Sequence, residues 1–215
     1  MKILIISATT FEIQPTIDFF QENKEKINVA LDFVVTGIGQ VATTFHLMKA
    51  LQGADFQMLI NVGVAGAYDS KLNLGDVVNV VIEEFGDLGA EDNDGSFINF
   101  YENGLILSDD FPFMKGKMYN IFGSEFDFLP QVKGLTVNKV HGFLPSIERT
   151  KQYFQADVET MEGAAIFYTC LQSNINFLEI RAISNYVEAR NRNNWQMPLA
   201  IANLNKVLIE MLCSF

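Results

Sequence analysis

The stretch Gln57–Gly66, QMLINVGVAG, decides the class of fold. Its first six residues, 57–62, form a short apolar run of the kind that is typical of a buried strand. Gly63–Gly66 follow at once, and glycine after a strand permits a tight turn and a close approach of a ligand to the main chain. We therefore expect a buried strand that ends in a turn beside a binding site.

Apolar runs and helical patterns alternate along the rest of the chain. The patterns predict strands at Lys2–Ile6, Leu31–Thr36, Gln57–Val62, Asp76–Glu84, Leu135–Val140 and Phe177–Ser184, and helices at Glu12–Lys24, Gln40–Leu51, Glu159–Leu171 and Gln196–Leu212. The middle, Gly86–Gly134, is less regular. Apolar strands that alternate with helices indicate an α/β fold with a largely parallel sheet, whose ligands bind at the carboxyl ends of the strands. No linker or repeat interrupts residues 1–215, so we expect a single domain.

Composition excludes several functions. Hydrophobic residues make up 49% and charged residues 19% of the chain, which is a globular composition. A net charge of −11 disfavours nucleic-acid and anionic-membrane partners, which both need a basic surface. No apolar run approaches the roughly 18 residues of a membrane span. Cys170 and Cys213 suggest neither a disulfide framework nor a thiolate metal site, and we expect a cytoplasmic protein without metal or cofactor.

The glycine turns lack the companions of a phosphate site. Neither Gly37–Gln40 nor Gly63–Gly66 continues into Gly-Lys-Ser/Thr, and neither is a full dinucleotide fingerprint. Arginine usually contributes to phosphate sites, yet the first arginine is Arg149. Water is therefore favoured over phosphate as the second reactant.

Several motifs resemble one enzyme superfamily. Ile60–Gly66 followed by Leu74–Val78, the string Glu159–Ala165 and the string Arg181–Asn185 resemble segments of purine nucleoside phosphorylases and methylthioadenosine/S-adenosylhomocysteine nucleosidases. They keep that order and approximate spacing over nearly the whole chain. Two further strings, residues 85–92 and 184–192, resemble the futalosine hydrolase branch.

The resemblance implies a three-layer α/β/α fold around a mixed, partly closed sheet. It also implies a homodimer or larger homo-oligomer, in which the second subunit often lines the 5′ end of the ribose site. The implied reaction is hydrolysis of a 5′-modified, inosine-type nucleoside, with water as co-substrate and hypoxanthine as the product base. An adenine nucleosidase of the methylthioadenosine type, a phosphorylase and a non-catalytic nucleoside-binding protein remain alternatives.

Two glutamates match the chemistry of N-glycosidic cleavage. The reaction builds positive charge on the sugar and negative charge on the purine, so it needs carboxylates near the sugar and hydrogen-bond donors near the base. By resemblance, Glu162 binds the ribose hydroxyls, Met161 packs beneath the sugar, and Glu12 activates the attacking water. The structural alternative is that both glutamates are first-turn acids favoured by a helix dipole.

Asn185 bears on the leaving base. Adenine-cleaving members of the superfamily commonly carry aspartate at this position, which can pass a proton to purine N7. An asparagine amide cannot do so, but it can donate a hydrogen bond to N7 or O6 of a 6-oxopurine. We therefore expect hypoxanthine as the leaving base, although an amide can also pair with N6 and N7 of adenine.

The remaining candidates line the expected pocket. Phe143 resembles the aromatic residue that stacks on the purine, and Leu144 follows it. Ala65 and Gly66 offer backbone to the substrate, and Trp195 corresponds to an aromatic wall of the 5′ pocket. Arg190 and Arg192 lie near that tryptophan in the sequence; they suit a carboxylate on the 5′ substituent, or they are solvated.

The other polar residues have weaker assignments. His141 is expected to orient its loop, and His46 is expected to be structural. The acidic residues Asp87, Glu91 and Asp92 have no assigned role.

Overall fold

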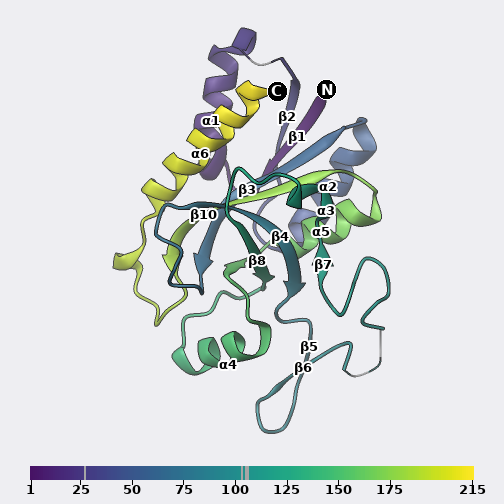
Figure 1. The fold of residues 1–215 in the computed structure, drawn as a ribbon, viewed down its shortest axis with the longest axis vertical. Helices are drawn as coiled ribbons and strands as arrows, with labels where there is room; N and C mark the ends of the chain where they lie inside the picture. The colour runs from purple at the N-terminus through teal and green to yellow at the C-terminus, as the bar shows by residue number, and fades with distance from the viewer. Residues whose placement is uncertain (27, 103, 105–106) are drawn as a thin grey trace.

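The protein is a mixed α/β structure, obtained as a computed structural model that describes residues 1–26, 28–102, 104 and 107–215 (Figure 1). Within these residues, eight strands form one sheet in the order β10-β4-β8-β9-β3-β1-β2, with β7 beside β4. The strands are β1 (Lys2–Ser7), β2 (Ala30–Val35), β3 (Met58–Ala67), β4 (Val77–Phe85), β7 (Met118–Tyr119), β8 (Gln131–Thr136), β9 (Val158–Thr160) and β10 (Phe177–Tyr186). A separate hairpin is made by β5 (Gly89–Glu91) and β6 (Phe97–Asn99).

The sheet is mixed and partly closed, as predicted. Strand β3 pairs in parallel with β1 and β10 and antiparallel with β9. Strand β10 continues to β4, β4 to β8, and β8 back to β9, so five strands close on themselves. The open part, β1 and β2, extends from β3. Closure brings β9 and β10 to opposite sides of β3.

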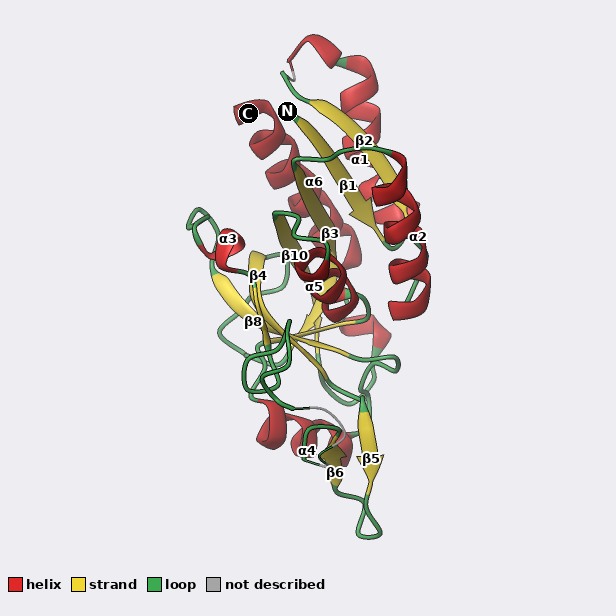
Figure 2. Ribbon diagram, turned by 90° about the vertical axis from the view of Figure 1, so that its right-hand side faces the viewer, coloured by secondary structure: helices red, strands yellow, loops and turns green. Residues whose placement is uncertain are grey.

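Helices cover both faces, which gives three layers (Figure 2). Helices α1 (Thr10–Glu22) and α6 (Met197–Ser214) lie on one face, and α2 (Gln40–Gly53) and α5 (Gly163–Gln172) on the other. Along β1, Ile3 and Ile5 enter the core under α1 and α6, whereas Leu4 and Ile6 enter the core under α2 and α5. Because each buried side chain of this size stabilises the fold by about 1.5–3 kcal/mol, burial on both faces explains the apolar run.

Three predicted elements have other boundaries in the structure, and two helices were not predicted. Gly63–Gly66 continue β3 instead of forming a turn, because β9 and β10 pair with it there. The strand expected at Leu135–Val140 lies earlier, as β8. The helix expected from Glu159 begins at Gly163, because residues 158–160 form β9. Helix α4 (Leu144–Phe154) was not predicted, and the short helix α3 (Ile121–Ser124) lies in the irregular middle.

Candidate active site

A cavity of about 450 Å³ opens where β1, β3 and β10 end and α1 and α5 begin. This volume suits a nucleoside-sized ligand. Seven of the nine residues expected to form the site line it: Glu12, Ala65, Gly66, Met161, Glu162, Asn185 and Trp195. The structure thus gathers residues that are 183 positions apart in the sequence, at the sheet edge where ligands bind in α/β folds.

Glu12 is held rigidly at the start of α1. Its Oε2 atom accepts hydrogen bonds from the Ser7 hydroxyl (3.1 Å), the Thr9 amide (3.0 Å) and the Thr9 hydroxyl (2.7 Å). Its Oε1 atom accepts from the amide of Val64 on β3 (3.1 Å). The contact to Thr9 resembles half of a capping box, so the carboxylate stabilises the helix start and is at the same time fixed in orientation. The structural and the catalytic interpretations of Glu12 are therefore compatible.

Arg181 lies directly behind Glu12, and the sequence analysis gave it no role. A Cβ atom placed on Gly63 would lie 2.2 Å from Arg181 Nη1 and 3.0 Å from Glu12 Oε1. A glycine at position 63 is therefore required for the guanidinium and the carboxylate to approach the same point of β3. The guanidinium is fully buried, and its Nη2 atom has no hydrogen-bond partner among the described residues.

Glu162 is the N-cap residue of α5 and faces the cavity. Its Oε1 atom accepts a hydrogen bond from the backbone amide of Gly39 (2.9 Å). A positive φ of 89° at Gly39 allows that amide to point toward the carboxylate. Burial raises the pKa of Glu162, and the nearby Arg181 guanidinium partly opposes this shift. Glu12 and Glu162 thus share one buried counterion.

Glu179 pairs with that counterion, and a further buried carboxyl group, Glu83, lies beside Glu179. Arg181 Nε donates to Glu179 Oε1 at 2.8 Å, and both side chains are buried. Glu83 lies next to Glu179, accepts the Thr136 hydroxyl at 3.0 Å, and is fully buried. Burial, followed by repulsion from Glu179, raises the pKa of Glu83 well above its ordinary value. A phosphate ion at Arg181 would therefore meet several carboxylates, which is consistent with water as the second reactant.

Asn185 is placed by a β-bulge in β10. The register passes from Ile183 opposite Ala65 to Asn185 opposite Gly66, which leaves Ser184 as the extra residue. The Ser184 hydroxyl donates to Asn185 Oδ1 (2.8 Å), and Asn185 Nδ2 donates to the Tyr186 carbonyl (3.0 Å). Because the amide nitrogen has two hydrogens, one N–H remains for a ligand.

One wall of the cavity contains an indole with a cation over it. Trp195 lines the cavity, and the guanidinium of Arg190 lies 5.3 Å from its ring centroid. Arg192 lies 5.9 Å from the same ring but does not line the cavity. Arg190 is therefore the better placed of the two to meet a ligand carboxylate.

Phe143 and Leu144 do not line this cavity. Phe143 is the N-cap residue of α4 with 66% of its surface exposed, and Leu144 is the first residue of that helix and 54% exposed. The chain reaches the cavity earlier, at Val140, which lines it together with Glu159. Because Phe143 begins α4 and is largely exposed, its position gives no support to stacking on a purine in this cavity. His141 bonds Glu159 through Nδ1 and Thr150 through Nε2 (3.0 Å), so it orients its loop as expected.

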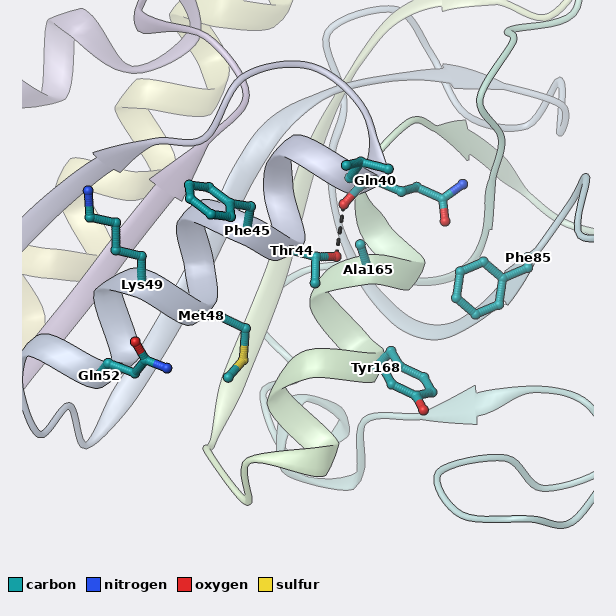
Figure 3. Close-up of a pocket in the computed structure, with 10 residues that line it drawn as sticks. Gln40, Thr44, Phe45, Met48, Lys49, Gln52, Phe85, Ala165 and Tyr168 are labelled. Carbon is teal, nitrogen blue, oxygen red and sulfur yellow. Dashed lines mark hydrogen bonds between the residues drawn. The ribbon is translucent and has the colours of Figure 1, made fainter.

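A larger hollow of about 750 Å³ lies elsewhere, between α2 and α5 (Figure 3). Its lining is mainly apolar, with Phe45, Met48 and Phe85 facing it, and it lacks convergent carboxylates. No group of three or more His, Cys, Asp or Glu residues that could hold a metal occurs among the described residues. Within the same part of the chain, no helix is long and apolar enough to cross a bilayer.

Comparison with known proteins identifies the family. The model of the phosphorylase superfamily matches residues 2–212, and the chain belongs to this superfamily. It is similar to the 5′-methylthioadenosine/S-adenosylhomocysteine nucleosidase of Glaesserella parasuis serovar 5, at 25% identity over 248 residues that cover 100% of both chains. It is also similar to the futalosine hydrolase of Thermus thermophilus, at 26% identity over 189 residues that cover 84% of this chain and 80% of the relative.

A solved structure shares the fold. The native futalosine hydrolase of Helicobacter pylori superposes with a TM-score of 0.78 at 16% identity, and the match covers 100% of this chain and 98% of the other. The two proteins therefore share the fold described above.

Proposed function

We propose that this protein hydrolyses the N-glycosidic bond of futalosine, releases hypoxanthine, and serves menaquinone biosynthesis. The enzyme belongs to the broader class of N-ribosyl hydrolases, to which relatives of both names belong. In this reaction Glu12 activates water, Glu162 binds the ribose hydroxyls above Met161, and Asn185 donates a hydrogen bond to the departing base. Ala65 and Gly66 approach the nucleoside with their backbone, and Trp195 with Arg190 receives the 5′ substituent.

The observation that carries the proposal is the hydrogen bonding of the Asn185 side chain. Its Oδ1 atom accepts from the Ser184 hydroxyl and its Nδ2 atom donates to the Tyr186 carbonyl, which leaves one amide N–H for a ligand of the cavity that Asn185 lines. Such a donor suits N7 or O6 of hypoxanthine, whose negative charge spreads onto O6 as the bond breaks. Adenine has no such oxygen and leaves poorly unless it is protonated, which a carboxamide cannot do.

A methylthioadenosine/S-adenosylhomocysteine nucleosidase is the second candidate function. It is favoured by the relative of that name, whose identity to this chain, 25%, is close to the 26% of the futalosine hydrolase. An asparagine amide can also pair with N6 and N7 of adenine, so binding of adenine is compatible with the site. The two candidates differ in the base that is released.

Replacement of Asn185 by Asp separates these candidates. We expect wild-type enzyme to release hypoxanthine from futalosine without added phosphate, and Asn185→Asp to shift the ratio of kcat/KM toward the 6-amino nucleoside by about tenfold or more. The ratio is measured by chromatography of the free bases, with Asn191→Asp on the exposed following loop as the control. A wild-type preference for the 6-amino nucleoside, or turnover that requires phosphate, would refute the proposed reaction.

We also propose that the protein forms a homodimer through the face of α2 and α5 (Figure 3). Val41 is 83% and Phe45 63% exposed there, beside Met48 and Tyr168, and such an apolar surface marks an interaction site. Ile38, which lines the nucleoside cavity, precedes this face, so a second copy would lie near the mouth of the site.

The oligomeric state tests this proposal. We expect light scattering to give twice the chain mass for the wild type, and Phe45→Glu to give the mass of the monomer. A monomeric wild type contradicts the proposal.

A further inference from the structure

Three residues form a row across the sheet at the floor of the cavity. On β3, Gly66 pairs with Glu159 of β9 on one side and with Asn185 of β10 on the other. All three line the cavity, and Gly66 contributes no side chain between the other two. A Cβ atom at position 66 would lie 3.1 Å from Asn185 Nδ2, so the glycine keeps this part of the floor open.

The width of the row suits a planar base. Neighbouring strands are about 4.8 Å apart, so the main chains at Glu159 and Asn185 are separated by roughly 10 Å across Gly66. Both side chains extend into this space, and a heterocycle over Gly66 would have a polar group on each side. Asn185 provides a donor, as described above, and Glu159 provides the second group.

Glu159 is fixed in place as a hydrogen-bond acceptor. Its Oε1 atom accepts the amide of His141 (3.0 Å), and its Oε2 atom accepts from the Tyr68 hydroxyl and from His141 Nδ1. Because a carboxylate only accepts, His141 Nδ1 carries a proton toward Glu159, and the Thr150 hydroxyl lies 3.0 Å from His141 Nε2. The glutamate is 4% exposed and lines the cavity.

From this arrangement we infer that Glu159 is a specificity-determining residue, which accepts the N1–H group of a 6-oxopurine whose N7 or O6 faces Asn185. The inference rests on the proposed function and deepens it. Hypoxanthine has a donor at N1, whereas adenine has a lone pair there, which a fixed acceptor repels. Tyr68 and His141 are positioning residues, because they act through Glu159.

A change in selectivity tests this role. We expect Glu159→Gln to lower the ratio of kcat/KM for futalosine over its 6-amino analogue by about tenfold or more, because a glutamine amide can donate to N1 as well as accept from it. The matched control is Glu148→Gln, an exposed glutamate on α4, which should leave the ratio unchanged. If Glu159 had a purely structural role, Glu159→Gln would lower kcat/KM for both nucleosides together and would leave their ratio at the wild-type value.

The wild-type enzyme provides a second test that needs no variant. Futalosine methylated at N1 keeps O6 and N7 but has no N1–H to donate. We expect its kcat/KM to be about 100-fold or more below that of futalosine, since a buried acceptor left without its donor is costly. Equal cleavage of the two nucleosides, or an unchanged ratio in Glu159→Gln, would overturn the role of Glu159 alone. Absence of futalosine hydrolysis by the wild type would instead refute the proposed function.

Discussion

Replacement of Glu12 by Gln is expected to lower kcat by about 10²–10⁴-fold, because a general base contributes on that order and an amide cannot take a proton from water. Substrate affinity should change much less, since Glu162 and Asn185 remain. The measurement is single-turnover release of hypoxanthine, combined with the dissociation constant of the nucleoside for the inactive variant.

The geometry adds a condition to this experiment. Glu12 accepts hydrogen bonds from four donors on both of its oxygens, whereas glutamine has one accepting oxygen. Glu12→Gln should therefore also lower the melting temperature, and activity must be compared where both proteins are folded. Glu22→Gln, at the exposed end of the same helix, is the control and should leave both quantities unchanged. Wild-type turnover in folded Glu12→Gln would remove Glu12 from the mechanism.

The largest effect on stability is expected for Arg181→Met. Removal of one partner of a buried ion pair typically costs about 3–5 kcal/mol of unfolding free energy, because the other charge stays buried without compensation. Here the guanidinium lowers the pKa of both Glu162 and Glu179 against the effect of burial. Without Arg181, these two pKa values should rise further above those of the unfolded chain.

The sign of the pH dependence follows from that rise. The folded variant would hold more protons than the unfolded chain above the ordinary pKa of glutamate, so its stability should fall as the pH increases through neutrality. The difference from wild type should thus be smallest in acid, as measured by urea unfolding at several pH values. The double replacement Glu179→Met with Arg181→Met should recover part of the loss, since it removes both charges. Arg149→Met, at an exposed position, should change the free energy by no more than about 0.5 kcal/mol.

The sequence predicted the layers of the fold more accurately than the ends of its elements. Apolar runs such as Lys2–Ile6 are buried on both faces, and this property can be read from the residues themselves. The end of β3 could not be read in this way, because Gly63–Gly66 have the composition of a turn and become strand only through pairing with β9 and β10. Short strands such as β9 depend in the same way on long-range pairing.

Site residues that stand in recognisable sequence motifs were predicted, whereas those whose position depends on the topology of the sheet were missed. Glu12, Glu162 and Asn185 stand in recognisable strings, and the structure brings all three to one cavity. Phe143 was misplaced because its position depends on where α4 begins. Arg181 and Glu179 left a detectable signal, since two charges of opposite sign, two positions apart in an apolar strand, must face the same side. Glu159 left none, because its role follows from pairing with Gly66.

The position of Trp195 gives the protein an internal optical probe. The chain contains one tryptophan, and that residue lines the candidate cavity, with two guanidinium groups near its ring. Emission excited selectively in the indole band therefore originates at the binding site alone. Occupancy of the cavity, and the rates at which a nucleoside enters and a base departs, become accessible to stopped-flow fluorescence without any label.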